Sequence, residues 1–143
     1  MILPDVNILL YAVNRSSDQH SAALHALRQG FDEPRGVAFA WAALLGFLRL
    51  STRRSIFPQP LQVDDALHVI EHWLGHLRSQ VVHPGERHAE ILRRLLRSTG
   101  AGGNLTTDAH LAALAIEHGA TVLSFERDFA RFEGVQWTSP VTK

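Results

Sequence analysis

The chain has 143 residues, of which 45% are apolar and 20% are charged. This length and balance predict one globular domain over residues 1–143, too short for two ordinary domains. The absence of cysteine excludes disulfides, thiolate nucleophiles and cysteine-based zinc sites. The formal net charge is zero, and the basic residues are thirteen arginines and Lys143. This excludes a generic polyanion binder and a Walker phosphate-binding loop, which needs a Gly-Lys pair.

Short apolar segments alternate with helical patterns along the chain. This alternation is typical of α/β proteins with a mainly parallel sheet. No signal peptide and no apolar stretch near the roughly 20 residues of a membrane helix is evident, so we expect a cytoplasmic protein without membrane contact. In chain order we expect a strand at 2–4, a helix or turn over 7–13, a helix capped by 16–18 and ending near 30, a strand at 37–39, helices over about 41–52 and 63–77, a strand at 81–82, helices over 86–98 and 109–118, a strand at 121–124 and an edge strand at 135–137.

Acidic residues lie next to three of these segments. Asp5 directly follows the first predicted strand, and Glu126 and Asp128 follow the fourth. Because the carboxyl ends of parallel strands meet at one edge of the sheet, these side chains are expected to converge there. Asp108 lies where the last predicted helix begins. Converging carboxylates attract a hard divalent cation, so the pattern predicts a metal site.

Each of these residues also has an ordinary structural interpretation. Asp5 could be a turn or N-cap residue, and Thr107 or Asp108 could cap the helix that follows. Glu126 and its neighbours could simply solvate a loop. Asn7 could position the Asp5 carboxylate or only stabilise the turn. The occurrence of acids at three such places, in a fold that would gather them, favours the metal site.

The histidines and arginines give weaker signals. A row at four-residue spacing, His68, His72 and His76, predicts a half-exposed helical face rather than a soft-metal site, because the His-Glu-x-x-His order is absent. Arg49 lies in an apolar helix and must reach a carboxylate, a helix end or solvent. A pair of arginines, Arg127 and Arg131, flanks the last acidic site and is expected to face phosphate. The three tryptophans, Trp41, Trp73 and Trp137, are expected in the core.

Taken together, several segments resemble the PIN-domain ribonucleases, and within them the VapC-type toxins of bacterial toxin–antitoxin pairs. The resemblance covers nearly the whole chain in order and spacing. The segments that carry it are Leu3-Pro4-Asp5-Val6-Asn7-Ile8-Leu9-Leu10-Tyr11-Ala12, Asn104-Leu105-Thr106-Thr107-Asp108-Ala109-His110 with the helix that follows, Glu126-Arg127-Asp128-Phe129-Ala130-Arg131-Phe132, and Trp137 with Pro140.

The resemblance implies a single three-layer α/β domain with a central sheet of about five parallel strands flanked by helices. It implies a Mg²⁺- or Mn²⁺-dependent endoribonuclease, a VapB-type antitoxin that covers the site, and a homodimer. By position, Asp5 and Asp108 correspond to the metal-binding pair, and Glu126 or Asp128 to the fourth acid. Asn7 and Thr107 are expected to support them, and Arg49, Arg127 and Arg131 to contact RNA phosphates.

The chain departs from the family pattern in two places. A glutamate is usual on the helix after the second strand, whereas residues 40–47 hold no acid, and Leu44 or a close neighbour takes that position. The fourth acid is commonly an aspartate where this chain has Glu126. A weakened second metal or one-metal chemistry is therefore expected, and the alternative is a catalytically weakened module that mainly binds antitoxin or RNA. A haloacid-dehalogenase-like phosphatase is disfavoured, because Asn7 replaces the required second aspartate.

Overall fold

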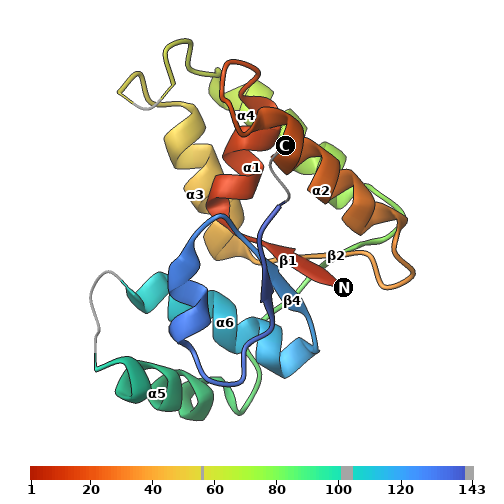
Figure 1. The fold of residues 1–143 in the computed structure, drawn as a ribbon. Coiled ribbons are helices and arrows are strands. Elements are labelled where there is room, and N and C mark those ends of the chain that lie inside the picture. Colours follow the sequence, from red (N-terminus) through yellow and green to blue (C-terminus); the bar gives the residue numbers. More distant parts are fainter. Residues whose placement is uncertain (56, 101–104, 141–143) are drawn as a thin grey trace.

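The computed structural model describes residues 1–55, 57–100 and 105–140. It confirms a central sheet of five strands in the order β3-β2-β1-β4-β5, in which every neighbouring pair is parallel (Figure 1). The strands are β1 (Ile2–Pro4), β2 (Val37–Phe39), β3 (Ser79–Val81), β4 (Thr121–Leu123) and β5 (Trp137–Thr138).

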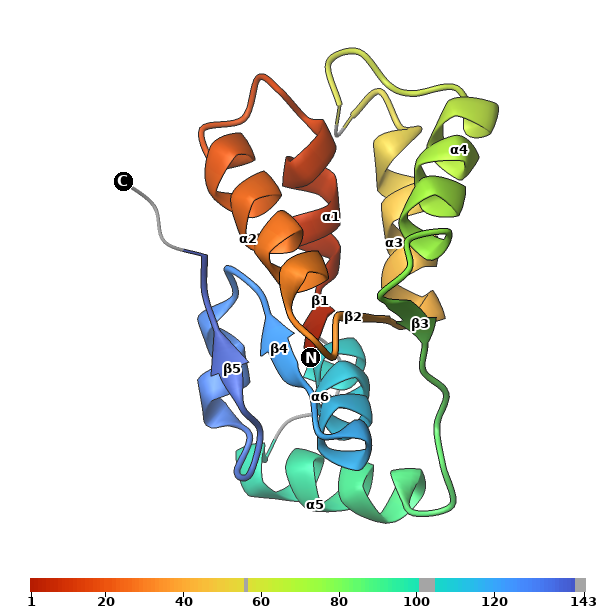
Figure 2. The ribbon, with the colours of Figure 1, turned by 90° about the vertical axis from the view of Figure 1, so that its right-hand side faces the viewer.

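Helices cover both faces of this sheet. The helices α1 to α4 lie on one face, and α5, α6 and the 3₁₀ helix η2 lie on the other, so the fold has three layers (Figure 2). No helix in the described part of the chain is long and apolar enough to cross a membrane. The helices are α1 (Val6–Val13), α2 (His20–Asp32), α3 (Trp41–Ser51), α4 (Val63–Leu74), α5 (His88–Thr99), α6 (Thr106–His118) and η2 (Arg127–Arg131).

The order of the strands places a crevice between β1 and β4. The chain adds β2 and β3 on one side of β1 and then crosses to β4 on the other side, so the direction of winding reverses there. Pro4 pairs with Leu123 at the carboxyl ends of these two strands. Ligands of open α/β sheets bind where the strand order reverses. The residues that directly follow Pro4 and Leu123 are therefore the first candidates for a site.

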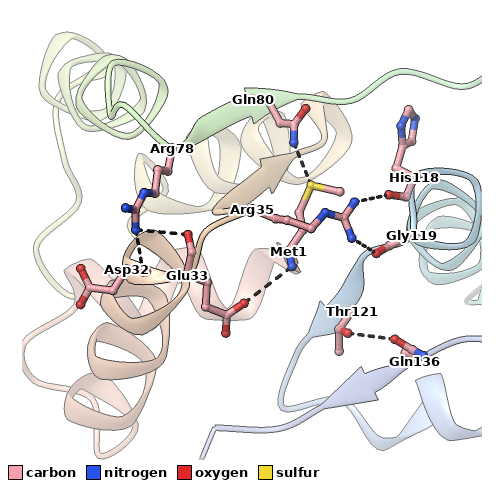
Figure 3. A network of polar contacts seen from close by, with 10 residues as sticks. All are labelled: Met1, Asp32, Glu33, Arg35, Arg78, Gln80, His118, Gly119, Thr121 and Gln136. Atoms are coloured by element: carbon pink, nitrogen blue, oxygen red, sulfur yellow. Dashed lines mark hydrogen bonds and ion pairs between the residues drawn. The ribbon is translucent and has the colours of Figure 1, made fainter.

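The strands are short and apolar because helices cover them on both sides. Leu3, Val37 and Val122 are fully buried, as expected for the centre of a parallel sheet. At the opposite, amino-terminal edge of the sheet, Arg35 donates to the carbonyl oxygens of His118 and Gly119 (Figure 3). Polar contacts thus close this edge and tie the two halves of the sheet together.

Several predicted boundaries were wrong by a few residues. The helix predicted over 63–77 ends at Leu74, with Gly75 as its C-cap. Leu77, which the predicted helix included, is therefore 94% exposed instead of being buried on the apolar face of that helix. The last helix begins at Thr106, earlier than predicted, and ends at Gly119 in the left-handed conformation that glycine favours. The predicted serine cap of α2 is wrong, since Gln19 is the N-cap and makes no side-chain bond to the helix. Strand β3 begins two residues before its predicted start, and β5 begins two residues after its predicted start.

The tryptophans are not all in the core. Trp73 is buried, and the Trp137 indole donates to the carbonyl oxygen of Ser124. Trp41 opens α3 and is 43% exposed, so its predicted burial was wrong. His68 and His72 lie on the exposed face of α4, as predicted, because α4 turns Ala66, Ile70 and Trp73 to the core. His76 lies beyond the end of the helix at Leu74 and is exposed there.

Candidate active site

A cleft of about 460 Å³ lies at the carboxyl ends of β1 and β4. All four predicted acids line it, together with Asn7, Thr107 and Arg49. The structure therefore brings together residues from α1, α3, α6 and the segment after β4. The residues around the cleft are Asp5, Val6, Asn7, Leu10, Gly46, Arg49, Leu50, Leu105, Thr107, Asp108, Glu126 and Asp128.

Asp5 is fixed at the base of the cleft. It is 6% exposed and is the N-cap of α1, where its Oδ1 accepts a 2.7 Å hydrogen bond from the Val6 N–H. Its Oδ2 accepts from the Ser124 hydroxyl at 2.8 Å and from the Asn7 amide at 3.3 Å. Burial raises the pKa of Asp5, and the bonds from Ser124 and Val6 partly oppose that rise. Asp5 thus serves both as the N-cap of α1 and as a residue of the cleft.

Ser124 is the residue of the site that sequence reasoning missed. It is fully buried directly after β4, and its hydroxyl accepts hydrogen bonds from the Asn7 amide and the Glu126 N–H. Asn7 also accepts from the Phe125 N–H at 3.2 Å. These bonds link the start of α1 to the segment that carries Glu126. The available signal was a hydroxyl residue at the end of a strand, beside the strand that ends at Asp5.

Asp108 lies in the first turn of α6 and is half-buried. Its pKa is raised to about 6, mainly by burial and then by the negative charges of Asp5, Glu126 and Asp128. This electrostatic coupling shows that the four acids share one region of space. Like charges held together in this way are stabilised by a bound cation.

The last acidic residues lie at the more open side of the cleft. Glu126 is exposed and caps η2, and Asp128 lies in the first turn of η2. Arg131 approaches Asp128 at 3.8 Å, and both side chains are about half exposed. Arg127 is exposed on the same short helix. The predicted acids and arginines therefore alternate along this segment.

Helix α3 contributes no carboxylate to the cleft. Leu44 is fully buried in the core, so it does not occupy the position that faces the acids. Gly46 lines the cleft instead, one turn before Arg49. A Cβ atom built on Gly46 would lie 2.7 Å from Cγ2 of Val6, so a longer side chain cannot enter here unless Val6 moves. The part of the cleft that α3 lines thus consists of Gly46, Arg49 and Leu50.

The donor set fits a small hard ion held by few protein ligands. Within residues 1–55, 57–100 and 105–140, no three histidine, cysteine or acidic side chains are placed to hold one metal ion together. Magnesium commonly binds through one or two carboxylates and keeps several waters. Asp5 and Asp108 provide such a pair, since they line one cleft and the charge of Asp5 raises the pKa of Asp108.

Comparison with known proteins agrees with this fold and site. The model of the PIN domain matches residues 2–135. Ribonuclease VapC37 of Mycobacterium tuberculosis is 46% identical over 140 residues, which cover 98% of this chain and 97% of the relative. Ribonuclease VapC33 of the same organism is 40% identical over 144 residues, with 99% of each chain covered.

Solved structures of lower identity share the fold. VapBC-1 from nontypeable Haemophilus influenzae superposes with a TM-score of 0.68 at 18% identity, covering 97% of this chain and 98% of the other. Mycobacterium tuberculosis VapC20, a Sarcin-Ricin loop cleaving toxin, gives a TM-score of 0.64 at 19% identity, covering 95% and 99%. A parallel five-stranded sheet with acids at the β1–β4 crevice is the architecture of a PIN domain. The chain belongs to the PIN-domain family and, within it, to the VapC ribonucleases of toxin–antitoxin systems.

Proposed function

We propose that this protein is a Mg²⁺- or Mn²⁺-dependent endoribonuclease that hydrolyses RNA phosphodiester bonds as the toxin of a toxin–antitoxin pair. The observation that carries the proposal is the convergence of four acids on one cleft at the β1–β4 crevice, where the other three acids help to raise the pKa of Asp108. Such a cluster is costly for the folded protein unless a cation neutralises it. The relatives named ribonucleases support RNA as the substrate.

The residues of the cleft suggest distinct roles in hydrolysis. Asp5 and Asp108 would hold the ion, with Asp5 oriented by Ser124 and Asn7. When bound, the ion would make a water more acidic and offset charge on the phosphate. Glu126 or Asp128 would orient this water and accept its proton as the water oxygen attacks phosphorus and the opposite P–O bond breaks. Thr107 lines the same cleft, and Arg49 and Arg127 would hold the neighbouring phosphates.

A groove at the other end of α1 from the acidic cleft supports an antitoxin partner. It has a volume of about 590 Å³ and lies between α2 and α4, where Leu24, Leu27, Phe31, Val69 and Trp73 give it an apolar lining. Solved neighbours such as VapBC-1 are complexes of a VapC protein with VapB. The proposed occupant is therefore an apolar segment of a VapB-type antitoxin.

The same groove indicates how far that partner must extend. It is lined by the last residues of α1, Ala12 and Val13, whereas the acidic cleft is lined by Asp5 to Asn7 at its start. An antitoxin that covers the acids must therefore continue beyond the groove. Homodimer formation, expected from the resemblance, and action in the cytoplasm, expected from the sequence, remain part of the proposal.

Cleavage of total RNA by Asp5→Asn and Asp108→Asn variants tests the nuclease proposal. Both variants should lose cleavage at millimolar Mg²⁺, and the wild-type protein should lose it when a chelator is added. The amide keeps the size of the side chain but removes the charge that holds the ion. Asp64→Asn, an exposed acid in the first turn of α4, is the matched control and should cleave normally. Full cleavage by either site variant would refute these assignments.

The weakened-module alternative has one observation in its favour, the absence of an acid on α3. Calorimetric titration with Mn²⁺ separates the two proposals. Binding of the ion together with RNA cleavage supports the nuclease. Binding of RNA or antitoxin without ion binding and without cleavage supports the module.

A further inference from the structure

Three exposed arginines lie on the outer face of α5, a helix that carries none of the four acids of the cleft. The side chains of Arg93, Arg94 and Arg97 are exposed and line a depression of about 450 Å³ together with Glu90 and Ser98. Arg97 follows Arg93 by four residues and Arg94 by three on one helix, so it is a neighbour of both on the helix surface. We refer to Arg93, Arg94 and Arg97 as the α5 arginine cluster.

The cluster lacks protein partners in the described part of the chain, unlike four of the other ten arginines. In the described residues, Arg35 and Arg78 donate to backbone carbonyls, and Arg87 and Arg131 pair with nearby acids. No ion pair or side-chain hydrogen bond to the cluster occurs within the same described ranges, and Arg87 approaches the one acid of the depression, Glu90, at 3.8 Å. Like charges this close repel one another, so the cluster would be stabilised by an external anion.

The cluster lies on the same side of the sheet as the acids of α6 and η2. Both views show α5 packed beside α6, the helix that begins near Asp108 (Figures 1 and 2). The contact includes a 2.9 Å hydrogen bond between the His88 and His110 rings. Towards η2, a Cβ atom built on Gly134 would lie 3.8 Å from Nη2 of Arg94. Arg94 therefore reaches the turn that follows the segment carrying Asp128.

The geometry points to an extended RNA-binding surface: we propose that the α5 arginine cluster binds backbone phosphates of the RNA whose scissile phosphate lies in the acidic cleft. This inference rests on the proposed nuclease function and adds a substrate surface to it. Guanidinium groups bind phosphate oxygens through paired hydrogen bonds and tolerate any base sequence. Arg127 is exposed on η2, next in sequence to Asp128 of the cleft.

The position of the cluster favours nucleic acid over an acidic protein partner. Its depression is lined only by charged and polar residues, so it offers no apolar pocket to anchor a protein side chain. The apolar groove lies in the opposite helical layer, between α2 and α4. Antitoxin and the distal part of the RNA would thus contact different layers of the molecule.

Salt-dependent binding of single-stranded RNA tests the inference without catalysis. A fluorescent RNA oligonucleotide is titrated with protein in chelator-containing buffer at several KCl concentrations. For the Arg93→Gln/Arg94→Gln/Arg97→Gln variant we expect at least a tenfold higher Kd at low salt. The slope of log Kd against log[KCl] should fall by about 2, because each phosphate contact to a single strand contributes roughly 0.7.

Matched variants distinguish a local surface from a change in overall charge. Arg15→Gln/Arg53→Gln/Arg54→Gln removes the same charge from exposed loops of the α1–α4 layer and should leave the slope nearly unchanged. Arg93→Lys/Arg94→Lys/Arg97→Lys keeps the charge and should keep most of the slope. If the glutamine variant does not fold, the single Arg94→Gln variant should lower the slope by roughly 0.7.

Three results would overturn the inference. The first is an unchanged slope in the glutamine variant, and the second is an equal loss of slope in the loop-arginine control. The third is a change in oligomeric state caused by the glutamine variant, measured by sedimentation, which would make the cluster an interface between copies or with another protein. Failure of the nuclease proposal is recognised separately, because it appears as persistent cleavage by Asp5→Asn, whatever the salt slope.

Discussion

Asp108 is the residue whose ionisation opposes folding most directly in the absence of metal. Its folded-state pKa of about 6 lies above the ordinary value of 3.8. The free energy of unfolding therefore falls as pH rises from about 4 to 6 and stays lower above that range. Asp108→Asn should stabilise the metal-free protein at pH 7.5. Since the side chain is only half-buried, we expect a gain of about 1 kcal/mol, equivalent to roughly 3 °C in melting temperature.

Thermal denaturation in chelator, at pH 7.5 and pH 4, measures this effect. The gain should largely disappear at pH 4, where the wild-type carboxyl is protonated in the folded state. Asp64→Asn provides the control, because Asp64 is exposed in the first turn of α4. A lower melting temperature for Asp108→Asn at pH 7.5 would mean that the carboxylate makes a net stabilising contact, contrary to its raised pKa.

The acids of the cleft and the support of Asp5 by Asn7 were predictable from sequence, whereas the role of Ser124 was not. Asp5 and Glu126 follow apolar strands, and parallel strands bring such positions together. The Ser124 hydroxyl that holds Asp5 is separated from it by 119 residues, and serine is common at the end of any strand. Its role depends on the Pro4–Leu123 register, which no local pattern specifies. Gly46 was missed for a similar reason, since only the packing of α3 against Val6 turns it towards the cleft.

At the scale of elements, the contact between α1 and α3 depends on the missing side chain at Gly46. A methyl group there would lie 2.7 Å from Cγ2 of Val6, whose branched side chain has few alternative rotamers. Gly46→Ala gains up to about 1 kcal/mol in helix propensity but loses roughly 1–3 kcal/mol by overpacking. We expect a net loss of about 1 kcal/mol in chemical denaturation. Cleavage should also weaken, because the Val6 N–H positions Asp5.

A double-mutant cycle with Val6→Ala checks the cause of that loss. If the two side chains collide, Val6→Ala/Gly46→Ala should be more stable than the sum of the single changes predicts. Additive changes would place the strain elsewhere in α3. The same cycle shows whether a longer acid on α3 could ever reach the cleft, because any side chain at Gly46 must first pass Val6.

The end of α4 is a feature that the sequence pattern did not predict. Leu77 continues the apolar spacing of α4, yet it is 94% exposed because the helix has already ended at Leu74. Periodicity predicted the buried face correctly through Ala66, Ile70 and Trp73, which pack against the sheet and neighbouring helices. The end of the helix depends instead on the turn into β3, which pairs with β2 far away in sequence. The local sequence therefore predicts that α4 is a helix, whereas the residue at which α4 ends depends on contacts that are distant in sequence.

Over the whole molecule, the two ends of α1 separate the proposed antitoxin site from the acidic cleft. The acidic cleft opens where α1 begins, and the apolar groove lies where α1 ends, between α2 and α4. The net charge of zero does not reveal this arrangement, in which four acids line the cleft and three exposed arginines line a depression on α5. A substitution in the groove should therefore affect inhibition by the antitoxin without affecting RNA cleavage.

Val69→Asp makes that expectation specific, because Val69 lines the groove and is only partly buried. A charge there must lose water when an apolar antitoxin segment docks, so the Kd for the proposed VapB-type antitoxin should rise by at least tenfold. Cleavage of RNA by the free variant should match the wild type, which also shows that it folds. Val63→Asp on the same helix, where the side chain is 56% exposed, is the control and should bind antitoxin normally. If the antitoxin inhibits Val69→Asp as well as the wild type, it binds outside the groove. If Val63→Asp weakens antitoxin binding equally, the effect of Val69→Asp comes from general electrostatics and not from the groove.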